Sequence, residues 1–203
     1  MIKKRVLSAL LLALIAISFF PLSQHKAMAK SADPIVVSMT FDGPLTPVWR
    51  TYLQRGIDQA VSQDAELLVI QLNTPGGAVD LMNSLVQQIL ACPVPVVVYV
   101  SPQGAMAASA GTLLVLAGDY AAMSPGSVIG AASPVGMQGE DIETTLEAKT
   151  KEILRASVRS MAERRGEDAV QLAEEAIENA RAASANEALA VNLVDFIASD
   201  LDD

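Results

Sequence analysis

The chain has 203 residues, of which 51% are hydrophobic and 18% are charged, and its formal net charge is −9. This length fits one domain behind a targeting segment, and the acidic balance argues against nucleic acid as the main partner. The single cysteine, Cys92, excludes an internal disulfide framework. One histidine and one cysteine are too few ligands for a common zinc site, so we expect neither a metal nor a cofactor.

The N-terminal residues have the pattern of a secretory signal peptide. Basic residues at 3–5 precede an uncharged apolar run over 6–20, and Ala-Met-Ala at 27–29 fits the small-x-small cleavage rule. The apolar run is shorter than the roughly 20 residues of a membrane span. We therefore expect residues 1–29 to be a cleaved signal peptide or an N-terminal anchor. Residues 30–203 then form one exported domain, in the periplasm or another extracytoplasmic compartment.

Removal of this segment changes the charge and the available chemistry. Residues 1–29 contain four of the 14 basic residues and none of the 23 acidic ones, so the remainder carries a net charge of −13. They also contain the only histidine, His25. A mature chain without histidine excludes a Ser-His-Asp triad and a Cys-His pair. Its lysines are Lys30, Lys149 and Lys151.

The first half of the mature chain alternates between strands and helices. A strand is predicted over 35–41, followed by a helix over 47–62 that Thr46 caps. A strand over 67–72 leads to a helix over 79–91, and an apolar strand follows over 94–100. This last strand is apolar throughout, which is typical of a strand covered on both faces of its sheet.

The second half begins with small residues and ends with charged helices. Residues 104–118 are predicted to be a loop that enters a helix, 120–123 a short strand, and 124–139 partly a loop. The remaining elements are predicted as helices over 142–165, 168–182 and 184–190 and a strand over 193–197. Strands that alternate with helices indicate a parallel α/β sheet with right-handed crossovers.

Two segments of small residues could carry chemistry. Leu72–Gly77 and Gly104–Thr112 each follow an apolar strand and open a helix. Backbone N–H groups at such helix starts bind negative charge, and glycine allows a substrate to approach closely. Ser109, between alanines, would present an accessible hydroxyl, and two such loops on neighbouring strands could form an oxyanion hole. The same residues also fit close helix packing and an ordinary turn, so the pattern alone leaves both interpretations open.

A serine nucleophile needs a base, which without histidine is a carboxylate or a lysine kept neutral by burial. On a helical wheel, Lys149 lies at the edge of an apolar face that includes Leu146 and Ile153, whereas Lys151 lies farther round. We therefore expect Lys149 to turn inward. The alternative is that both are solvated helix lysines.

Several short motifs occur together in one order and spacing. They lie at 72–77, 102–105, 107–112, 124–131, 158–166 and 186–189. On these motifs, the chain from about Pro34 to Leu201 resembles the NfeD-type membrane-associated serine proteases, relatives of the Clp protease proteolytic subunit and signal peptide peptidase A. The resemblance implies a ClpP/crotonase-like α/β fold of stacked ββα units in a single domain.

The resemblance also implies roles for individual residues. Ser109 matches the nucleophile and Lys149 the general base of a Ser-Lys dyad, while the N–H groups of Gly77 and Ala110 match the oxyanion hole. The implied substrate is a hydrophobic peptide or protein segment, notably in a stomatin-like membrane partner. The family further suggests a homodimer or a higher homo-oligomer.

Three functions remain open at this point. The first is an exported serine endopeptidase, and the second is a non-catalytic scaffold or binding module of the same fold in membrane-protein quality control. The third is acyl-CoA chemistry, because crotonase-type enzymes use similar oxyanion holes. Intact Ser109 and Lys149 favour the peptidase over the scaffold. The export signal argues against acyl-CoA, which is a cytoplasmic substrate.

Overall fold

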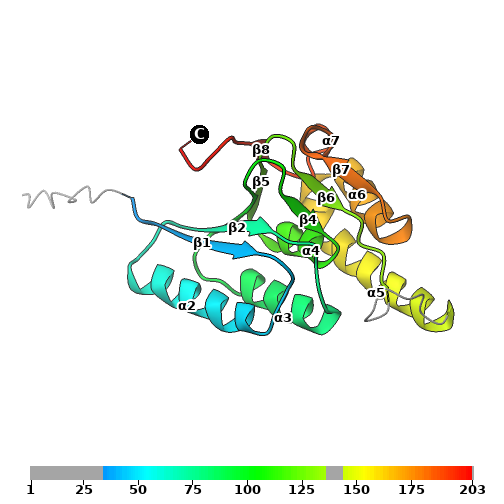
Figure 1. Cartoon of the computed structure of the whole chain (residues 1–203), viewed down its shortest axis with the longest axis horizontal. Helices are drawn as coiled ribbons and strands as arrows, with labels where there is room; N and C mark the ends of the chain where they lie inside the picture. The colour runs from blue at the N-terminus through cyan, green and yellow to red at the C-terminus, as the bar shows by residue number, and fades with distance from the viewer. Residues whose placement is uncertain (1–33, 136–143, 203) are drawn as a thin grey trace, which may run out of the picture. The chain divides into compact units, whose positions relative to one another are not determined.

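The computed structural model describes residues 34–135 and 144–202, which belong to one compact unit of the chain (Figure 1). The predicted signal peptide or anchor over 1–29 lies outside the described residues. Among the helices of the described residues, none is both long enough and apolar enough to cross a membrane.

A five-stranded sheet forms the centre of the fold, in the order β1-β2-β3-β5-β8. Its strands are β1 (Val36–Asp42), β2 (Leu67–Asn73), β3 (Val96–Val100), β5 (Tyr120–Met123) and β8 (Phe196–Ile197). Every neighbouring pair is parallel, as predicted. β3 is buried along its whole length because its apolar run packs on both sheet faces.

Helices α2 (Val48–Ser62), α3 (Val79–Leu90) and α4 (Ala110–Ala117) follow β1, β2 and β4. Figure 1 shows α2 and α3 side by side along one face of the sheet. The predicted cap of α2 is wrong: Pro47 holds the N-cap position without a side-chain hydrogen bond. Thr46 contributes its carbonyl oxygen instead, which accepts the Trp49 N–H at 3.0 Å. A proline with φ of −55° presets the helical backbone, so no side-chain cap is required.

A second sheet of three short strands was not predicted. It consists of β4 (Met106–Ala108), β6 (Val128–Gly130) and β7 (Ala182–Ser184), in the order β4-β6-β7. Residues 104–108 and 128–130 were expected to be loop, and 182 to end a helix. Three residues are too few to show an alternating pattern, so pairing between distant segments decides these strands.

The remaining helices are α5 (Thr144–Ala162), the short 3₁₀ helix η1 (Glu163–Arg165), α6 (Glu167–Glu178) and α7 (Ala185–Ala190). α5 and α6 pack together, and Arg159 Nε donates to Glu174 Oε1 across them at 2.6 Å. α7 begins with a capping box in which Ser184 and Glu187 bond each other's backbone N–H groups. The helix predicted from Ile142 starts outside the described residues.

Candidate active site

Ser109 occupies the sharp turn between β4 and α4. Its backbone has φ of 53° and ψ of −122°, a conformation that costs energy for a residue with a side chain. Hydrogen bonds hold it from both sides: its N–H donates to the Gly130 carbonyl at 2.9 Å, and its carbonyl accepts the Thr112 N–H at 3.0 Å. The turn places a half-buried serine at the start of a helix, as the sequence predicted.

Thr112 ties this turn to the second sheet. Its fully buried hydroxyl lies 3.0 Å from the Ala107 carbonyl and 3.1 Å from the Gly130 carbonyl, and it accepts the Gly130 N–H at 3.1 Å. A buried hydroxyl that is satisfied in this way fixes the backbone on which Ser109 depends. In the sequence, Thr112 stands out only as part of a motif, and its pattern does not indicate this role.

The second loop of small residues lies directly beside the first. Thr74 pairs with Ala107 in parallel, donating its N–H to the Met106 carbonyl at 2.7 Å and accepting the Ala108 N–H at 3.0 Å. The Thr74 hydroxyl accepts the Gly76 N–H at 3.0 Å. The two loops of small residues therefore lie in contact, as an oxyanion hole formed from both would require.

Gly76 is the point of closest approach between the loops. A Cβ at this position would lie 2.6 Å from the Ser109 Cβ and 3.1 Å from the Ala110 nitrogen, and φ is +107°. Only glycine fits such a contact. Within the described part of the chain, the N–H groups of Gly77 and Ala110 donate no hydrogen bond. The Ala110 N–H thus directly follows the serine, and the Gly77 N–H follows the glycine that contacts it. Gly76, which makes the contact, was not singled out from the sequence.

Lys149 lies on α5 and is exposed. The buried side of α5 carries Leu154, Val158 and Ala162, whereas Ile153 is 66% exposed. The expectation that Lys149 turns inward is therefore wrong for the single chain. The helical wheel grouped the apolar residues of this helix on one face, but the face that is buried when α5 packs against α6 is an adjacent one, which contains Leu154, Val158 and Ala162.

Lys151 is the more enclosed of the two lysines. Its Nζ pairs with Glu147 Oε1 at 2.8 Å, and this hydrogen bond raises the pKa of Lys151. In the described residues, neither hydrogen bond nor ion pair joins Lys149 to Ser109. The structure brings Ser109, Gly77 and Ala110 together and leaves Lys149 at the surface.

Other groups offer less chemistry. No cluster of three His, Cys, Asp or Glu side chains able to hold a metal occurs in residues 34–135 and 144–202. Burial raises the pKa of the Cys92 thiol, which disfavours the nucleophilic thiolate.

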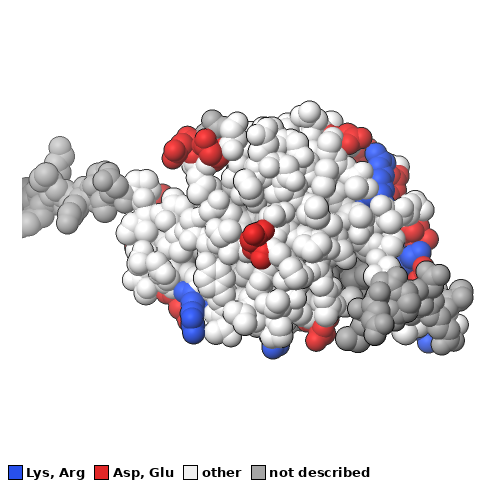
Figure 2. All heavy atoms as spheres, in the orientation of Figure 1, with Lys and Arg blue, Asp and Glu red and all other residues white. Residues whose placement is uncertain are grey.

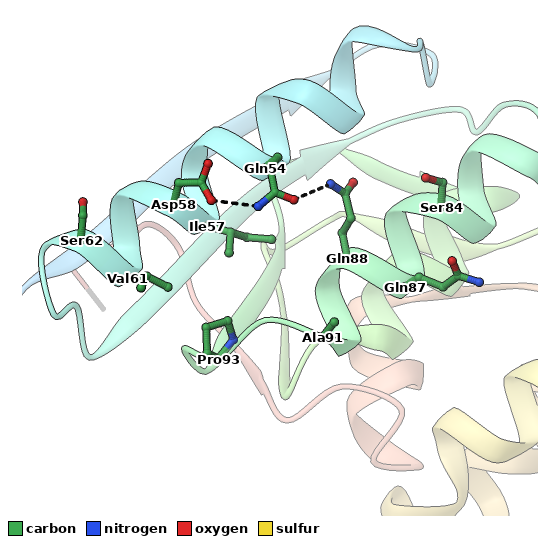
Figure 3. A pocket seen from close by; sticks show the side chains of 10 residues that line it. All are labelled: Gln54, Ile57, Asp58, Val61, Ser62, Ser84, Gln87, Gln88, Ala91 and Pro93. Carbon is green, nitrogen blue, oxygen red and sulfur yellow. Dashed lines mark hydrogen bonds between the residues drawn. The ribbon is translucent and has the colours of Figure 1, made fainter.

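A groove of about 650 Å³ runs between α2 and α3 (Figure 3). Along it, Gln54 Nε2 donates to Asp58 Oδ1 at 2.9 Å, and Gln88 Nε2 donates to Gln54 Oε1 at 3.2 Å. The groove is lined by two serines, Ser62 and Ser84, and its one carboxylate that could act as their base, Asp58, already accepts a hydrogen bond from Gln54. It therefore does not compete with the Ser109 turn as a catalytic site.

The family described as the N-terminal domain of NfeD1b matches residues 34–199. The chain belongs to this family. The family recognition drawn from the motifs is thereby confirmed. Relatives of this NfeD1b-family chain include a membrane-bound protease, PH1510, of Pyrococcus horikoshii, 35% identical over 85% of this chain and 39% of its own length. Another is the membrane protein NfeD1b of Bacillus subtilis, 29% identical over 63% of this chain and 28% of its own length. The chain thus spans about two fifths or less of these relatives.

Solved structures confirm the predicted fold. A serine-to-alanine mutant of 1510-N, a membrane-bound stomatin-specific protease, matches with a TM-score of 0.77 and 34% identity, over 84% of this chain and 83% of that one. A lysine-to-alanine mutant in complex with a substrate peptide matches with a TM-score of 0.77 and 32% identity, over 84% and 78%. ClpP1 from Listeria monocytogenes matches with a TM-score of 0.65 at 17% identity, over 81% and 92%, which shows the ClpP-like fold alone.

Proposed function

We propose that this chain is an exported serine endopeptidase in which Ser109 is the nucleophile and Lys149 the general base. The observation that carries the proposal is the strained Ser109 turn beside the free N–H groups of Gly77 and Ala110. The relatives support it, because matching structures are serine and lysine mutants of a protease, one with a bound peptide.

In the proposed mechanism, neutral Lys149 accepts the Ser109 hydroxyl proton as Ser109 attacks a peptide carbonyl. The Gly77 and Ala110 N–H groups stabilise the tetrahedral oxyanion, and protonated Lys149 then donates to the leaving amine. Water releases the acyl group. This mechanism requires Lys149 to leave solvent, because a lysine is kept neutral by burial. A second copy of the chain that covers exposed Leu146 and Ile153 would enclose Lys149 as well, which is why we propose a homodimer or higher homo-oligomer.

The proposed substrate is a hydrophobic peptide segment. Met106 and Val128 are partners in neighbouring strands close to Ser109, and they are 40% and 39% exposed. Figure 2 shows that the face bearing β1, β2 and β4 has few charged side chains, with lysine and arginine at its margins. A weakly charged surface with Met106 and Val128 exposed beside the Ser109 turn favours apolar ligands. Since a relative is named stomatin-specific, we include a stomatin-like membrane protein as a proposed partner.

The same proposal includes the domain organisation and the location. Residues 1–29 act as a signal peptide or an N-terminal anchor, and residues 30–203 form the protease domain outside the cytoplasm. N-terminal sequencing of the protein recovered from cells tests this division. A mature chain that starts at Lys30 supports cleavage, whereas a chain that starts at Met1 in the membrane fraction supports the anchor.

The decisive experiment measures cleavage of a set of hydrophobic peptides by the full chain in mild detergent, with Ser109→Ala in parallel. Ser62→Ala is the matched control, because Ser62 lies in the groove between α2 and α3. Activity in the unaltered chain and in Ser62→Ala, with none in Ser109→Ala, is the expected result. Equal activity in all three would overturn the assignment of Ser109. No cleavage by any of them would favour the non-catalytic scaffold, for which the exposure of Lys149 in the single chain is the favouring observation.

A further inference from the structure

A depression lies at the edge of the central sheet opposite to Ser109. Ser109 adjoins the loop after the carboxyl end of β2, whereas this depression adjoins the amino ends of β3 and β5. It consists of three adjoining cavities of about 510, 280 and 360 Å³, each lined by Asp119 and Arg164. We call it the Arg164 depression.

The third of these cavities is also lined by Arg165, whose hydrogen bonding is incomplete. The Arg165 side chain is only 4% exposed, and Nη1 pairs with Asp195 Oδ2 at 2.8 Å. The same Asp195 oxygen accepts the Ala121 N–H at 2.7 Å. Nε and Nη2 of Arg165 have no hydrogen-bond partner among the described residues. Both nitrogens have almost no accessible surface, so a ligand reaches them only when the lining of the cavity moves. Buried charged donors without partners are costly, and a ligand that satisfies them gains affinity by removing that cost.

The two unpartnered nitrogens define the shape of the acceptor. Nε–H and Nη2–H lie parallel along one edge of a guanidinium and match the two oxygens of a planar carboxylate. Arg164 is already engaged, since it donates to the Gly118 carbonyl, and so the free edge of Arg165 is the principal donor. The Asn192 side chain lines the same cavity and can bind a polar neighbour of the carboxylate.

Charge favours a carboxylate over a phosphate. Two arginines and two aspartates line this cavity, and Asp119 is held in place because its Oδ2 accepts the Val96 N–H at 2.8 Å. A monoanion adds one negative charge to a neutral set, whereas a phosphate dianion adds two beside the same aspartates.

The two other cavities indicate what accompanies the carboxylate. Leu90, 60% exposed, and Leu116 and Met161 line one of them, while Tyr120, 51% exposed, lines the other. Apolar surface therefore lies in the two cavities that share Asp119 and Arg164 with the cavity of Arg165. We propose that the Arg164 depression binds a peptide carboxylate that stands next to an apolar side chain, with the free edge of Arg165 as its bidentate donor. This site is independent of the Ser109 chemistry.

The test compares two probes on the full chain in detergent micelles. N-acetyl-leucine carries a carboxylate beside an apolar side chain, and N-acetyl-leucinamide has the same side chain without the charge. The readout is the ¹H–¹⁵N resonance of Arg165 Nε–H, assigned by its loss in Arg165→Lys. We expect N-acetyl-leucine to shift it saturably, with a dissociation constant on the order of 1 mM, and the amide to leave it unchanged.

Affinity is then measured by isothermal titration in two variants. Arg165→Lys should weaken binding of N-acetyl-leucine by about tenfold, because an ammonium does not offer the bidentate edge. The matched control is Arg181→Lys, since Arg181 is an exposed arginine paired with Glu175, and it should bind as the unaltered chain does.

Three results would overturn the proposal: no saturable shift with the carboxylate, an equal shift with the amide, or tighter binding of inorganic phosphate. Isothermal titration of the two probes on the unaltered chain needs no variant, so that comparison does not depend on whether Arg165→Lys folds.

Discussion

The Ser109 turn and the first half of α5 differ in how firmly the chain holds them. Ser109 is fixed by backbone bonds to Gly130 and Thr112, and a neighbouring loop lies in contact with it. Lys149 stands on a helix half whose neighbour Ile153 is 66% exposed. The proposed nucleophile is therefore pre-organised within one chain, whereas the proposed base is not. The proposed mechanism therefore requires a further surface that covers this half of α5.

The largest expected effect separates the two lysines of α5. Lys149→Ala should lower peptide cleavage by about 10³-fold or more, as removal of a catalytic base does, while Lys151→Ala should stay within about threefold. Both residues are on the same helix, and Lys149 is exposed, so the stability of its variant should be unchanged. Initial rates on one hydrophobic peptide, with urea unfolding of each variant, provide the measurement. A greater loss in Lys151→Ala would reassign the base.

The next largest effect is a loss of stability when the close contact beside Ser109 is overfilled. Gly76→Ala should lower the free energy of unfolding by about 3 kcal/mol. The alanine would have to adopt a positive φ, and its Cβ would collide with the Ser109 Cβ. Gly43→Ala is the matched control: φ is +94° there, but the space around it is open, so strain alone should cost about 1 kcal/mol. Urea denaturation compares the two. Equal costs would mean that the two loops are not in tight contact.

A smaller effect tests the hydroxyl under the turn. Thr112→Val keeps the shape but leaves the Gly130 N–H without its acceptor, and we expect a loss of about 2 kcal/mol. Thr150→Val on α5 removes an exposed hydroxyl that bonds the Leu146 carbonyl, and it should change stability by less than about 0.5 kcal/mol. Thermal and urea unfolding of both variants decide the matter. If the two substitutions lower the free energy of unfolding equally, the Ser109 turn is held no more firmly than α5.

The smallest effect concerns the Glu147–Lys151 pair. The pKa of Lys151 is raised in the folded chain. The Glu147–Lys151 pair therefore stabilises the folded chain fully when the pH is below the ordinary lysine pKa, and this contribution is lost as the pH rises through the raised pKa of the folded chain. Glu147→Gln should slightly lower the urea midpoint at pH 7, and the difference from the unaltered chain should vanish at strongly alkaline pH. Glu152→Gln is the control, because its partner Arg155 keeps its charge there. A Glu147→Gln difference that persists at high pH would contradict the assignment.

Much of the fold followed from local pattern. The β-branched run of β3 and the alternating burial of β1 are typical of strands, and the spacing of Leu81, Leu85 and Ile89 is typical of a helix. Such patterns arise because the side chains that face the core recur every two residues in a strand and every three to four in a helix. The candidate nucleophile was also found in this way, since a serine among alanines and glycine between a strand and a helix is a local feature.

The other determinants join segments that are distant in sequence. The three-residue strands β4, β6 and β7 exist because they pair with one another, and no single segment carries that information. The roles of Gly76 and Thr112 depend on which backbone comes to lie within contact distance of them. The burial of α5 depends on its packing against α6 and α4, in which Leu154 is buried and Ile153 is left in solvent.

Periodicity, turn residues and motif order are written along the chain, and they were enough to predict the parallel α/β architecture, the family and the candidate serine. Contacts between distant segments establish how the Ser109 turn is held, that Lys149 is exposed in the single chain, and that one edge of the buried Arg165 is unpaired among the described residues. These properties arise from close packing and hydrogen bonds between segments far apart in the sequence, which local pattern does not encode.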